Sequence, residues 1–243
     1  MDRPLLPPLE PHGRALWHYF QGDHGATLRL KSSLGEDDEI PIAVFFRGPE
    51  ELFPFEAYAL ELCRGRVLDA GAGTGVHSLI LQERGADVSA VEILPQAIEI
   101  LRGRGVKNVV EGDLFAVELG RFDTMLMLMN GIGPVGTVAG LERFFSRAGE
   151  LVAPGGQILV DSAAPAPDDV EVRPAAGVWP PSTDEAYPGE AWIELEYKGA
   201  IGEPFRELYV DAETLAAHGA RAGWACTIAF GDAEGGYLAR LTR

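Results

Sequence analysis

The chain has little cysteine and no long hydrophobic run. Its two cysteines, Cys63 and Cys226, have a spacing that suggests neither a disulfide framework nor a metal site. We expect both to be buried thiols, and no metal is expected. No segment reaches the ~18 consecutive apolar residues of a membrane-spanning helix, and the first residues lack the basic region and apolar run of a secretory signal. These features predict a cytoplasmic protein.

Basic residues are also scarce relative to acidic ones. Lys and Arg total 20 against 37 Asp and Glu, so the formal net charge is −17 and the sequence pI is about 4.6. Nucleic acids and anionic membrane surfaces are bound through basic patches. We therefore expect neither a nucleic-acid partner nor a membrane partner. The simplest role of the acidic excess is solubility.

Strand-like and helix-like segments alternate from residue 65 onward. Strands are predicted at 66–69, 87–92, 106–111, 122–129 and 157–162, and helices at 76–84, 95–104 and 140–152. Such alternation is typical of a parallel sheet with helices on both faces. A helix at 212–222 and strands at 224–230 and 237–242 then end the chain with a hairpin. The expected fold class is α/β, a Rossmann-like sheet of seven strands that is mostly parallel with an antiparallel C-terminal hairpin.

The first 48 residues are expected to form an N-terminal extension or cap on this fold. Its predicted segments are an extended arm at 1–11, a helix at 14–21, a strand at 27–32, an acidic turn at 35–39 and an apolar segment at 40–46. The apolar segment either pairs with the strand or packs as a lid. Residues 49–243 are the main domain, which starts with a helix at 49–63. It contains a long loop at 163–188 and an inserted β-hairpin near 190–210.

Residues 65–78, GRVLDAGAGTGVHS, combine a strand, a glycine-rich turn and the start of a helix. Gly71, Gly73 and Gly75 permit positive φ angles and let a ligand approach the backbone without meeting a Cβ atom. The free N–H groups at the start of the helix favour an anionic or electron-rich ligand group. Alone, the pattern fits an ordinary tight turn about as well as it fits a ligand cradle.

Two carboxylates after neighbouring strands favour a ligand that contains adenosine. Glu92 ends the second strand, where it can accept hydrogen bonds from two ribose hydroxyls. Asp113 follows the third strand and can either accept from an exocyclic amine or cap a turn. The dinucleotide pattern Gly-x-Gly-x-x-Gly would need a glycine where the chain has Val76. The spacing to Glu92 suits a dinucleotide and other adenosine-containing ligands alike.

Together these motifs resemble the class I S-adenosylmethionine-dependent methyltransferases, over residues 50–162 and again at 212–243. The matching stretches are VLDAGAGTG at 67–75, Glu92, EGDLF at 111–115 and the PGG turn at 154–156. The resemblance implies S-adenosylmethionine as the cofactor, with Asp69 orienting the glycine turn and holding the methionine ammonium. The cofactor-binding residues that it implies are Asp69, Gly71, Ala72, Gly73, Gly75, His77, Glu92, Ile93, Asp113, Leu114 and Met129.

The methyl-acceptor side is expected at residues 129–136, MNGIGPVG, after the fourth strand. This position faces the transferred methyl in the family, so Asn130 is either a catalytic residue that orients the acceptor or part of a flexible turn. The Asn/Asp-Pro-Pro-Tyr-type motif of enzymes that methylate nucleic acids or glutamine does not occur here. A small-molecule acceptor is therefore expected. The runs LMNGIG and YPGEAWIELEY also resemble a poorly characterised bacterial subgroup, from which no substrate carries over.

A base is needed only if the acceptor must lose a proton. The histidines considered for this role are His12, His18, His24 and His77. His18 lies in the aromatic N-terminal segment and is the second catalytic candidate, although a structural role is open for it. Asp161, at the end of the fifth strand, is expected either to contact the substrate or to cap a turn.

Methylation of a small molecule is the favoured function. Binding motifs alone do not separate it from a non-catalytic module that binds S-adenosylmethionine or S-adenosylhomocysteine and regulates a partner. A nicotinamide-dependent oxidoreductase is a third and weaker alternative. The sequence indicates neither the acceptor atom nor the oligomeric state.

Overall fold

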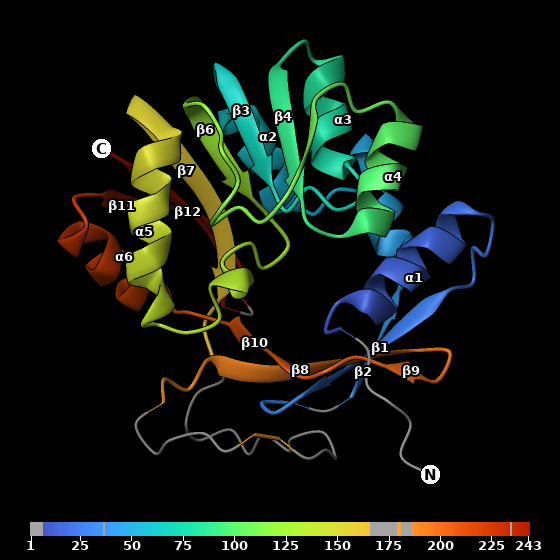
Figure 1. Cartoon of the computed structure of the whole chain (residues 1–243). Coiled ribbons are helices and arrows are strands. Elements are labelled where there is room, and N and C mark those ends of the chain that lie inside the picture. The colour runs from blue at the N-terminus through green and yellow to red at the C-terminus, as the bar shows by residue number, and fades with distance from the viewer. Residues whose placement is uncertain (1–6, 36, 166–178, 181–185, 234) are drawn as a thin grey trace.

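Two β-sheets form the framework of the computed structural model, which describes residues 7–35, 37–165, 179–180, 186–233 and 235–243 (Figure 1). The main sheet has seven strands in the order β11-β12-β7-β6-β3-β4-β5. These are β3 (Arg66–Ala70), β4 (Asp87–Glu92), β5 (Val109–Glu111), β6 (Phe122–Met127), β7 (Val152–Ala163), β11 (Ala225–Gly231) and β12 (Gly236–Thr242). β3 to β7 are parallel, and β12 runs antiparallel to β7 and β11. The predicted α/β fold with its C-terminal hairpin is thus confirmed.

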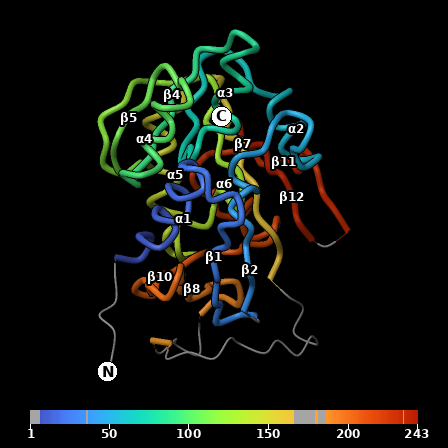
Figure 2. Tube along the Cα trace, turned by 90° about the vertical axis from the view of Figure 1, so that its right-hand side faces the viewer, coloured from blue at the N-terminus to red at the C-terminus, as the bar shows by residue number. Residues whose placement is uncertain are grey.

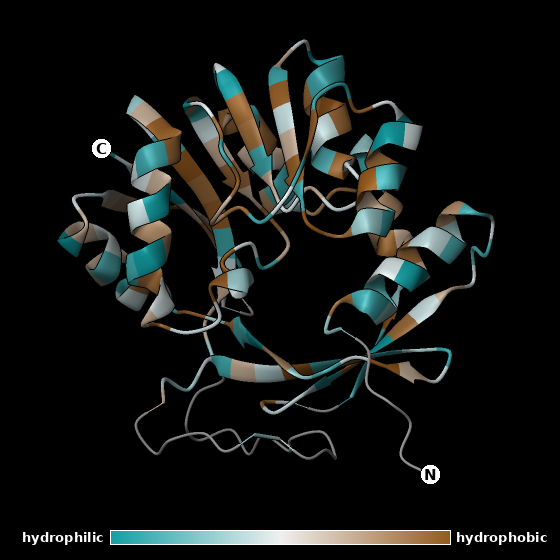
Figure 3. Cartoon of the chain, in the orientation of Figure 1, coloured by the Kyte–Doolittle hydropathy of each residue, from teal (hydrophilic) through white to brown (hydrophobic). Residues whose placement is uncertain are grey.

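Helices cover both faces of the main sheet. They are α2 (Pro54–Leu62), α3 (Val76–Glu83), α4 (Pro95–Arg104), α5 (Gly140–Leu151) and α6 (Ala212–Arg221). Because alternate strand residues point to opposite faces, Leu68 and Ile158 pack in the cluster of α5 and α6, whereas Val67 and Leu159 pack with α2 and α3. Hydrophobic residues accordingly run along the central strands β6 and β7 (Figure 3).

The second sheet joins two segments that are far apart in the sequence. Its strands are β1 (Thr27–Ser32), β2 (Asp38–Pro41), β8 (Glu190–Tyr197), β9 (Ala200–Ile201) and β10 (Phe205–Leu208). The order is β10-β8-β1-β2, with β9 also paired to β8. The N-terminal segment and the predicted insertion near 190–210 therefore form one layer. Whether residues 1–48 and 49–243 are separate domains stays a prediction.

Helix α1 (Glu10–Phe20) lies between this second sheet and α4 (Figures 1 and 2). Ala15 and Leu16 of α1 are buried together with Ile193 of β8 and with Ala97 and Ile100 of α4. The carboxyl ends of the parallel strands face the side of the molecule on which the second sheet lies (Figure 1). Ligands in such α/β sheets bind at that end, so the second sheet and α1 bound the region where a ligand is expected.

Several predicted segments differ from the observed elements. The helix expected at 49–63 is a short 3-10 helix, η2 (Pro49–Glu51), followed by α2, because the residue before Pro54 is held extended. The acidic turn expected at 35–39 overlaps β2, and the apolar segment at 40–46 leaves β2 at Pro41 to form the 3-10 helix η1 (Ile42–Phe46). This change of backbone buries Ile42 under the second sheet.

Other boundaries shift at both ends of the elements. α1 begins at Glu10, inside the arm expected at 1–11, of which residues 1–6 lie outside the described residues. The strand expected at 122–129 ends at Met127, and β7 starts earlier than the expected 157–162. Most of the long loop at 163–188 also lies outside the described residues. Within the described part of the chain, no helix is long and apolar enough to cross a membrane.

Candidate active site

The glycine turn between β3 and α3 leaves open space above its backbone. Gly71, Gly73 and Gly75 have φ angles of 78°, 55° and 87°. A Cβ atom on Gly75 would approach the side chains of Leu101 and Val106 to 2.8 and 3.0 Å, whereas one on Gly71 or Gly73 would have no neighbour within 4 Å. Gly75 is therefore required by packing, while the other two glycines form a cradle that a ligand can approach.

Glu92 connects this turn to the start of α4. Its Oε2 accepts a hydrogen bond from the Gly73 N–H at 2.7 Å, and its Oε1 accepts from the Ile93 and Leu94 N–H groups at 2.8 and 2.9 Å. The side chain of Ile93 next to it is 55% exposed. A buried carboxylate beside an exposed apolar side chain suits a ribose and a flat base, and the cofactor roles of Glu92 and Ile93 stay predictions.

Ala72 and Asp69 connect the glycine turn to the neighbouring elements by hydrogen bonds. The Ala72 N–H, like the Gly71 N–H, donates to the Val91 carbonyl. Asp69 is 2% exposed, and its Oδ2 accepts a hydrogen bond from the Ser78 hydroxyl at 2.6 Å. Burial raises the pKa of Asp69, while the neighbouring His77 and the bonds from Ser78 oppose the rise. The contacts of Asp69 therefore connect β3 to α3.

Asp113 and Leu114 follow β5 as predicted. Asp113 is exposed, and its Oδ1 accepts from the Phe115 N–H at 2.9 Å, so that it closes a local turn. Leu114 is partly buried against the core cluster of α5 and α6. In this structure the described contacts of both residues are those of a turn and of core packing, and their cofactor roles stay predictions.

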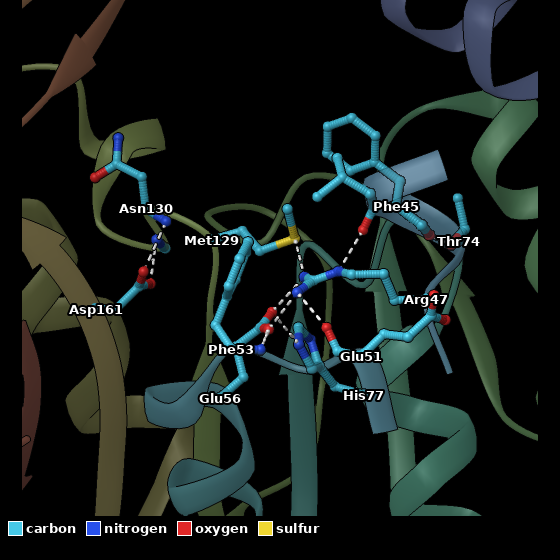
Figure 4. Close-up of polar contacts among 12 residues, drawn as sticks. Phe45, Arg47, Glu51, Phe53, Glu56, Thr74, His77, Met129, Asn130 and Asp161 are labelled. Carbon is cyan, nitrogen blue, oxygen red and sulfur yellow. Dashed lines mark hydrogen bonds and ion pairs between the residues drawn. The ribbon is translucent and has the colours of Figure 1, made fainter. Parts of the chain in front are cut away.

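A buried ion-pair network links the N-terminal segment to the helix after the glycine turn (Figure 4). The Arg47 guanidinium makes two 2.8 Å bonds to the Glu56 carboxylate, which is fully buried. Nε2 of His77 lies 3.0 Å from the same carboxylate. Burial would raise the pKa of Glu56, but the bonds from His77 and Arg47 outweigh it and lower that pKa. His77 thus contacts Glu56, and its predicted cofactor contact stays untested.

The same segment also contacts the turn directly. The Thr74 hydroxyl donates to the Phe45 carbonyl, and Arg104 donates to the Thr74 carbonyl at 2.8 Å. One Arg47 amino group lies 3.7 Å from the Met129 sulfur. Sequence reasoning missed Arg47 and Glu56, because the sequence Arg47-Gly48-Pro49 is typical of a break between elements and indicates no partner for Arg47.

Met129 and Asn130 leave β6 in a conformation that is uncommon for residues other than glycine. Their φ angles are 67° and 55°. Asp161, at the end of β7, accepts from the Asn130 N–H at 2.9 Å and from the Gly131 N–H at 2.8 Å (Figure 4). Both carboxylate oxygens of Asp161 therefore hold the 129–131 backbone, which supports its interpretation as a turn-capping residue.

The acceptor side contains a cavity of about 140 Å³ next to Asn130. It is lined by Phe55, Asn130, Asp161, Ser162, Ala163, Tyr209, Phe230, Asp232, Gly236 and Tyr237. Beside it, Glu207 of β10 accepts from Nδ2 of Asn130 at 3.4 Å and from the Tyr209 hydroxyl at 3.3 Å. Burial raises the pKa of Glu207. The second sheet thus brings a carboxylate to Asn130 that sequence reasoning did not identify.

His18 does not join this group. Its side chain is exposed on α1, and Nδ1 lies 3.1 Å from the Tyr197 hydroxyl of β8. Its described contacts include neither Asn130 nor the glycine turn. His12, which precedes it on α1, contacts the Phe45 ring in a tilted arrangement with the ring centroids 4.8 Å apart, and burial lowers the pKa of His12 to about 4. The catalytic role of His18 stays a prediction.

Comparisons with known proteins agree with this architecture. A family model described as a methyltransferase domain matches residues 45–225. A crystal structure of an S-adenosylmethionine-dependent methyltransferase from Bacteroides fragilis, in complex with S-adenosyl-L-homocysteine, is 36% identical. The similarity covers 98% of this chain and 97% of that one, with a TM-score of 0.85.

Curated relatives match over shorter stretches. A magnesium-protoporphyrin O-methyltransferase from Rhodobacter capsulatus is 42% identical over 69 residues, which are 26% of this chain and 31% of that protein. A ubiquinone biosynthesis O-methyltransferase from Xanthomonas oryzae is 29% identical over 114 residues, or 42% of this chain and 45% of that protein. The chain thus spans less than half the length of these curated relatives. The matched domain and the full-length structural similarity show that the chain belongs to the S-adenosylmethionine-dependent methyltransferases.

Proposed function

We propose that the protein transfers a methyl group from S-adenosylmethionine to a small-molecule acceptor. The observation that carries the proposal is the open space at Gly71 and Gly73 beside the Glu92 carboxylate, at the strand ends that also present Asn130. The cavity next to Asn130 offers room for a small acceptor group. Names of the curated relatives, which refer to protoporphyrin and ubiquinone biosynthesis, support an acceptor of this class.

Methyl transfer mainly requires that the protein hold the acceptor and S-adenosylmethionine in the correct relative position. When bound, S-adenosylmethionine supplies a methyl group on a cationic sulfur that a nucleophile can displace. Glu92 and Ile93 would hold the adenosine part, and the glycine turn would lie against the methionine part. Asn130 would orient the acceptor from the opposite side. Holding two reactants in line contributes roughly 7–11 kcal/mol to such a displacement, so the chain needs no nucleophile of its own.

Calorimetric titration with S-adenosylhomocysteine tests the cofactor half of the proposal. We expect the wild-type protein to bind it and Glu92→Ala to bind it about 10- to 100-fold more weakly, because a charge-assisted acceptor is removed. Glu99→Ala, which removes an exposed carboxylate from α4, is the matched control and should bind normally. Equal affinity of the Glu92 variant, or binding of NAD with no response to S-adenosylhomocysteine, contradicts the assignment.

Turnover tests the enzymatic half. A methyltransferase converts S-adenosylmethionine to S-adenosylhomocysteine in the presence of an acceptor, whereas a regulatory binding module holds the ligand unchanged. Mass spectrometry of the protein incubated with S-adenosylmethionine and small-molecule extracts would detect both the demethylated product and the methylated acceptor. Binding without any turnover would favour the regulatory alternative.

The pH dependence of turnover should follow Asp161. Burial raises the pKa of Asp161 from 3.8 to about 6, opposed by the bonds from Gly131 and Asn130. Protonation removes an acceptor for these N–H groups, so we expect activity to fall below about pH 6. Because the pKa of Asp161 is higher in the folded protein than in the unfolded chain, the folded state binds this proton more tightly. The contribution of Asp161 to the free energy of unfolding therefore decreases as pH rises from 3.8 to about 6, and acidification does not unfold the protein through this group. A kcat/KM profile that stays flat down to about pH 5 would contradict this expectation.

A further inference from the structure

We propose that the methyl acceptor is a primary or secondary amine, bound in the cavity that Asn130 lines, with its nitrogen on the side of Asn130 and the neighbouring Glu207. The inference rests on the proposed methyl transfer and adds the substrate class to it. Three independent features carry it: a surplus of hydrogen-bond acceptors, a carboxylate with no cationic partner, and aromatic walls.

Around Asn130 and Glu207, unpaired hydrogen-bond acceptors outnumber unpaired donors. The Asn130 backbone N–H is bonded to Asp161 and one of the two Nδ2 N–H groups is bonded to Glu207, whereas Oδ1 is shielded from water and has no donor within the described residues. Both bonds to Glu207 reach the same oxygen, Oε2, and are long, at 3.3 and 3.4 Å. The other oxygen, Oε1, accepts no bond from the described part of the chain. A ligand group that donates several hydrogen bonds would satisfy these oxygens.

The orientation of the Asn130 amide follows from the same contacts. A carboxylate can only accept when ionised, so the amide nitrogen must face Glu207. This leaves Oδ1 turned away from Glu207 as the second free acceptor. An acceptor molecule with a carboxylate or phosphate at this point would meet the carboxylates of Glu207 and Asp161, so anionic acceptor groups are disfavoured.

No basic side chain within the described residues balances Glu207. Arg206, its neighbour on β10, points to the opposite face of the sheet, where it contacts Glu190 at 3.3 Å and lies 4.5 Å from the Trp192 ring centroid. Glu207 shares its face with Ala191 of β8, which is fully buried. A partly buried carboxylate without a cation is costly unless a partner arrives. An ammonium group supplies both the positive charge and the missing donors.

Aromatic side chains line the cavity together with the carboxylates of Asp161 and Asp232. Phe55, Tyr209, Phe230 and Tyr237 line it together with Asn130. The faces of aromatic rings attract cations, most strongly where water is excluded. The cavity volume of about 140 Å³ limits the bound part of the acceptor to a small group around the amine.

The transfer step balances with the groups present. The amine must be neutral to react, so its ammonium form first passes one proton to the Glu207 carboxylate or to water. The nitrogen lone pair then forms the new C–N bond to the methyl carbon while the C–S bond breaks. The electron pair of the C–S bond stays on the sulfur, which becomes a neutral thioether. The product amine is cationic, and its extra proton leaves by the same route. A carboxylate whose pKa is raised by burial is suited to this exchange.

Benzylamine and benzyl alcohol are matched probes for this inference. Both are titrated into the protein saturated with S-adenosylhomocysteine, at about pH 7.5, where the amine is protonated. We expect benzylamine to bind at least about tenfold more tightly than benzyl alcohol. Glu207→Gln should remove this preference, whereas Glu203→Gln, which neutralises an exposed carboxylate in the same hairpin, should retain it.

The binding results for the two probes either support or contradict the assignment of an amine acceptor. Equal binding of the two probes, tighter binding of the alcohol, or no binding of benzylamine overturns it, as does a preference that survives in Glu207→Gln. The affinity for S-adenosylhomocysteine, measured on every variant, shows whether the fold and cofactor site are intact. If this affinity is present and the amine preference is not, the proposed methyl transfer stands and only the amine assignment fails.

Discussion

Replacing Arg47 with methionine is expected to lower the free energy of unfolding by about 3–5 kcal/mol. Methionine retains the apolar stem of the side chain but leaves the fully buried Glu56 carboxylate without its cationic partner, with only His77 and the Phe53 N–H bonded to it. The bonds from Arg47 to the Val44 and Glu51 carbonyls, at 2.7 and 3.2 Å, are lost as well. An uncompensated charge in the interior is among the most destabilising changes that a single substitution can make.

Urea denaturation followed by circular dichroism measures this effect. Arg29→Met is the matched control, because Arg29 pairs with Asp37 on an exposed face of β1, and exposed pairs contribute at most about 1 kcal/mol. The double variant Arg47→Met with Glu56→Gln should recover part of the loss, since the buried charge is then removed with its partner. A loss below about 1 kcal/mol in Arg47→Met would show that the pair carries little stability.

Asp161→Asn is expected to reduce kcat of methyl transfer about 100-fold while leaving affinity for S-adenosylhomocysteine within about twofold. The substituted side chain has one acceptor oxygen and one NH2 group in place of the two carboxylate oxygens. One of the two backbone N–H groups of Asn130 and Gly131 therefore loses its acceptor and faces the NH2 group instead. Met129 and Asn130 keep their positive φ angles only while the surrounding structure holds them. Small displacements of a positioning group are sufficient for losses of this size.

Asp123→Asn is the matched control for this variant. Asp123 also accepts a backbone N–H, from Arg66 at 2.8 Å, but it does so at the opposite end of the sheet. Both variants therefore remove one carboxylate acceptor, and only Asp161→Asn should affect turnover. An equal effect of the two substitutions, or a large loss of cofactor affinity in Asp161→Asn, would show that Asp161 acts through general stability.

Local sequence patterns were sufficient to predict the main sheet and to bring together, at one edge, the residues for which we propose a cofactor role. Parallel strands separated by helices have few possible arrangements, so the alternation from residue 65 onward indicated the fold. The turn at 71–75 and Glu92 lie next to each other because adjacent parallel strands end at the same edge. The distinction between Gly75, required by packing, and Gly71, open to a ligand, needed the positions of Leu101 in α4 and of Val106 after it.

The second sheet and the acceptor side depended on tertiary structure. β1 pairs with β8 although more than 150 residues separate them, and no local pattern specifies such a partner, because strand pairing depends on packing and register. That pairing brings Glu207 to Asn130. The Arg47, Glu56 and His77 network likewise joins three segments that sequence alone leaves unconnected. The sequence thus determined the fold through local periodicity, whereas long-range packing alone decided which side chains surround Asn130, where we propose that the acceptor binds.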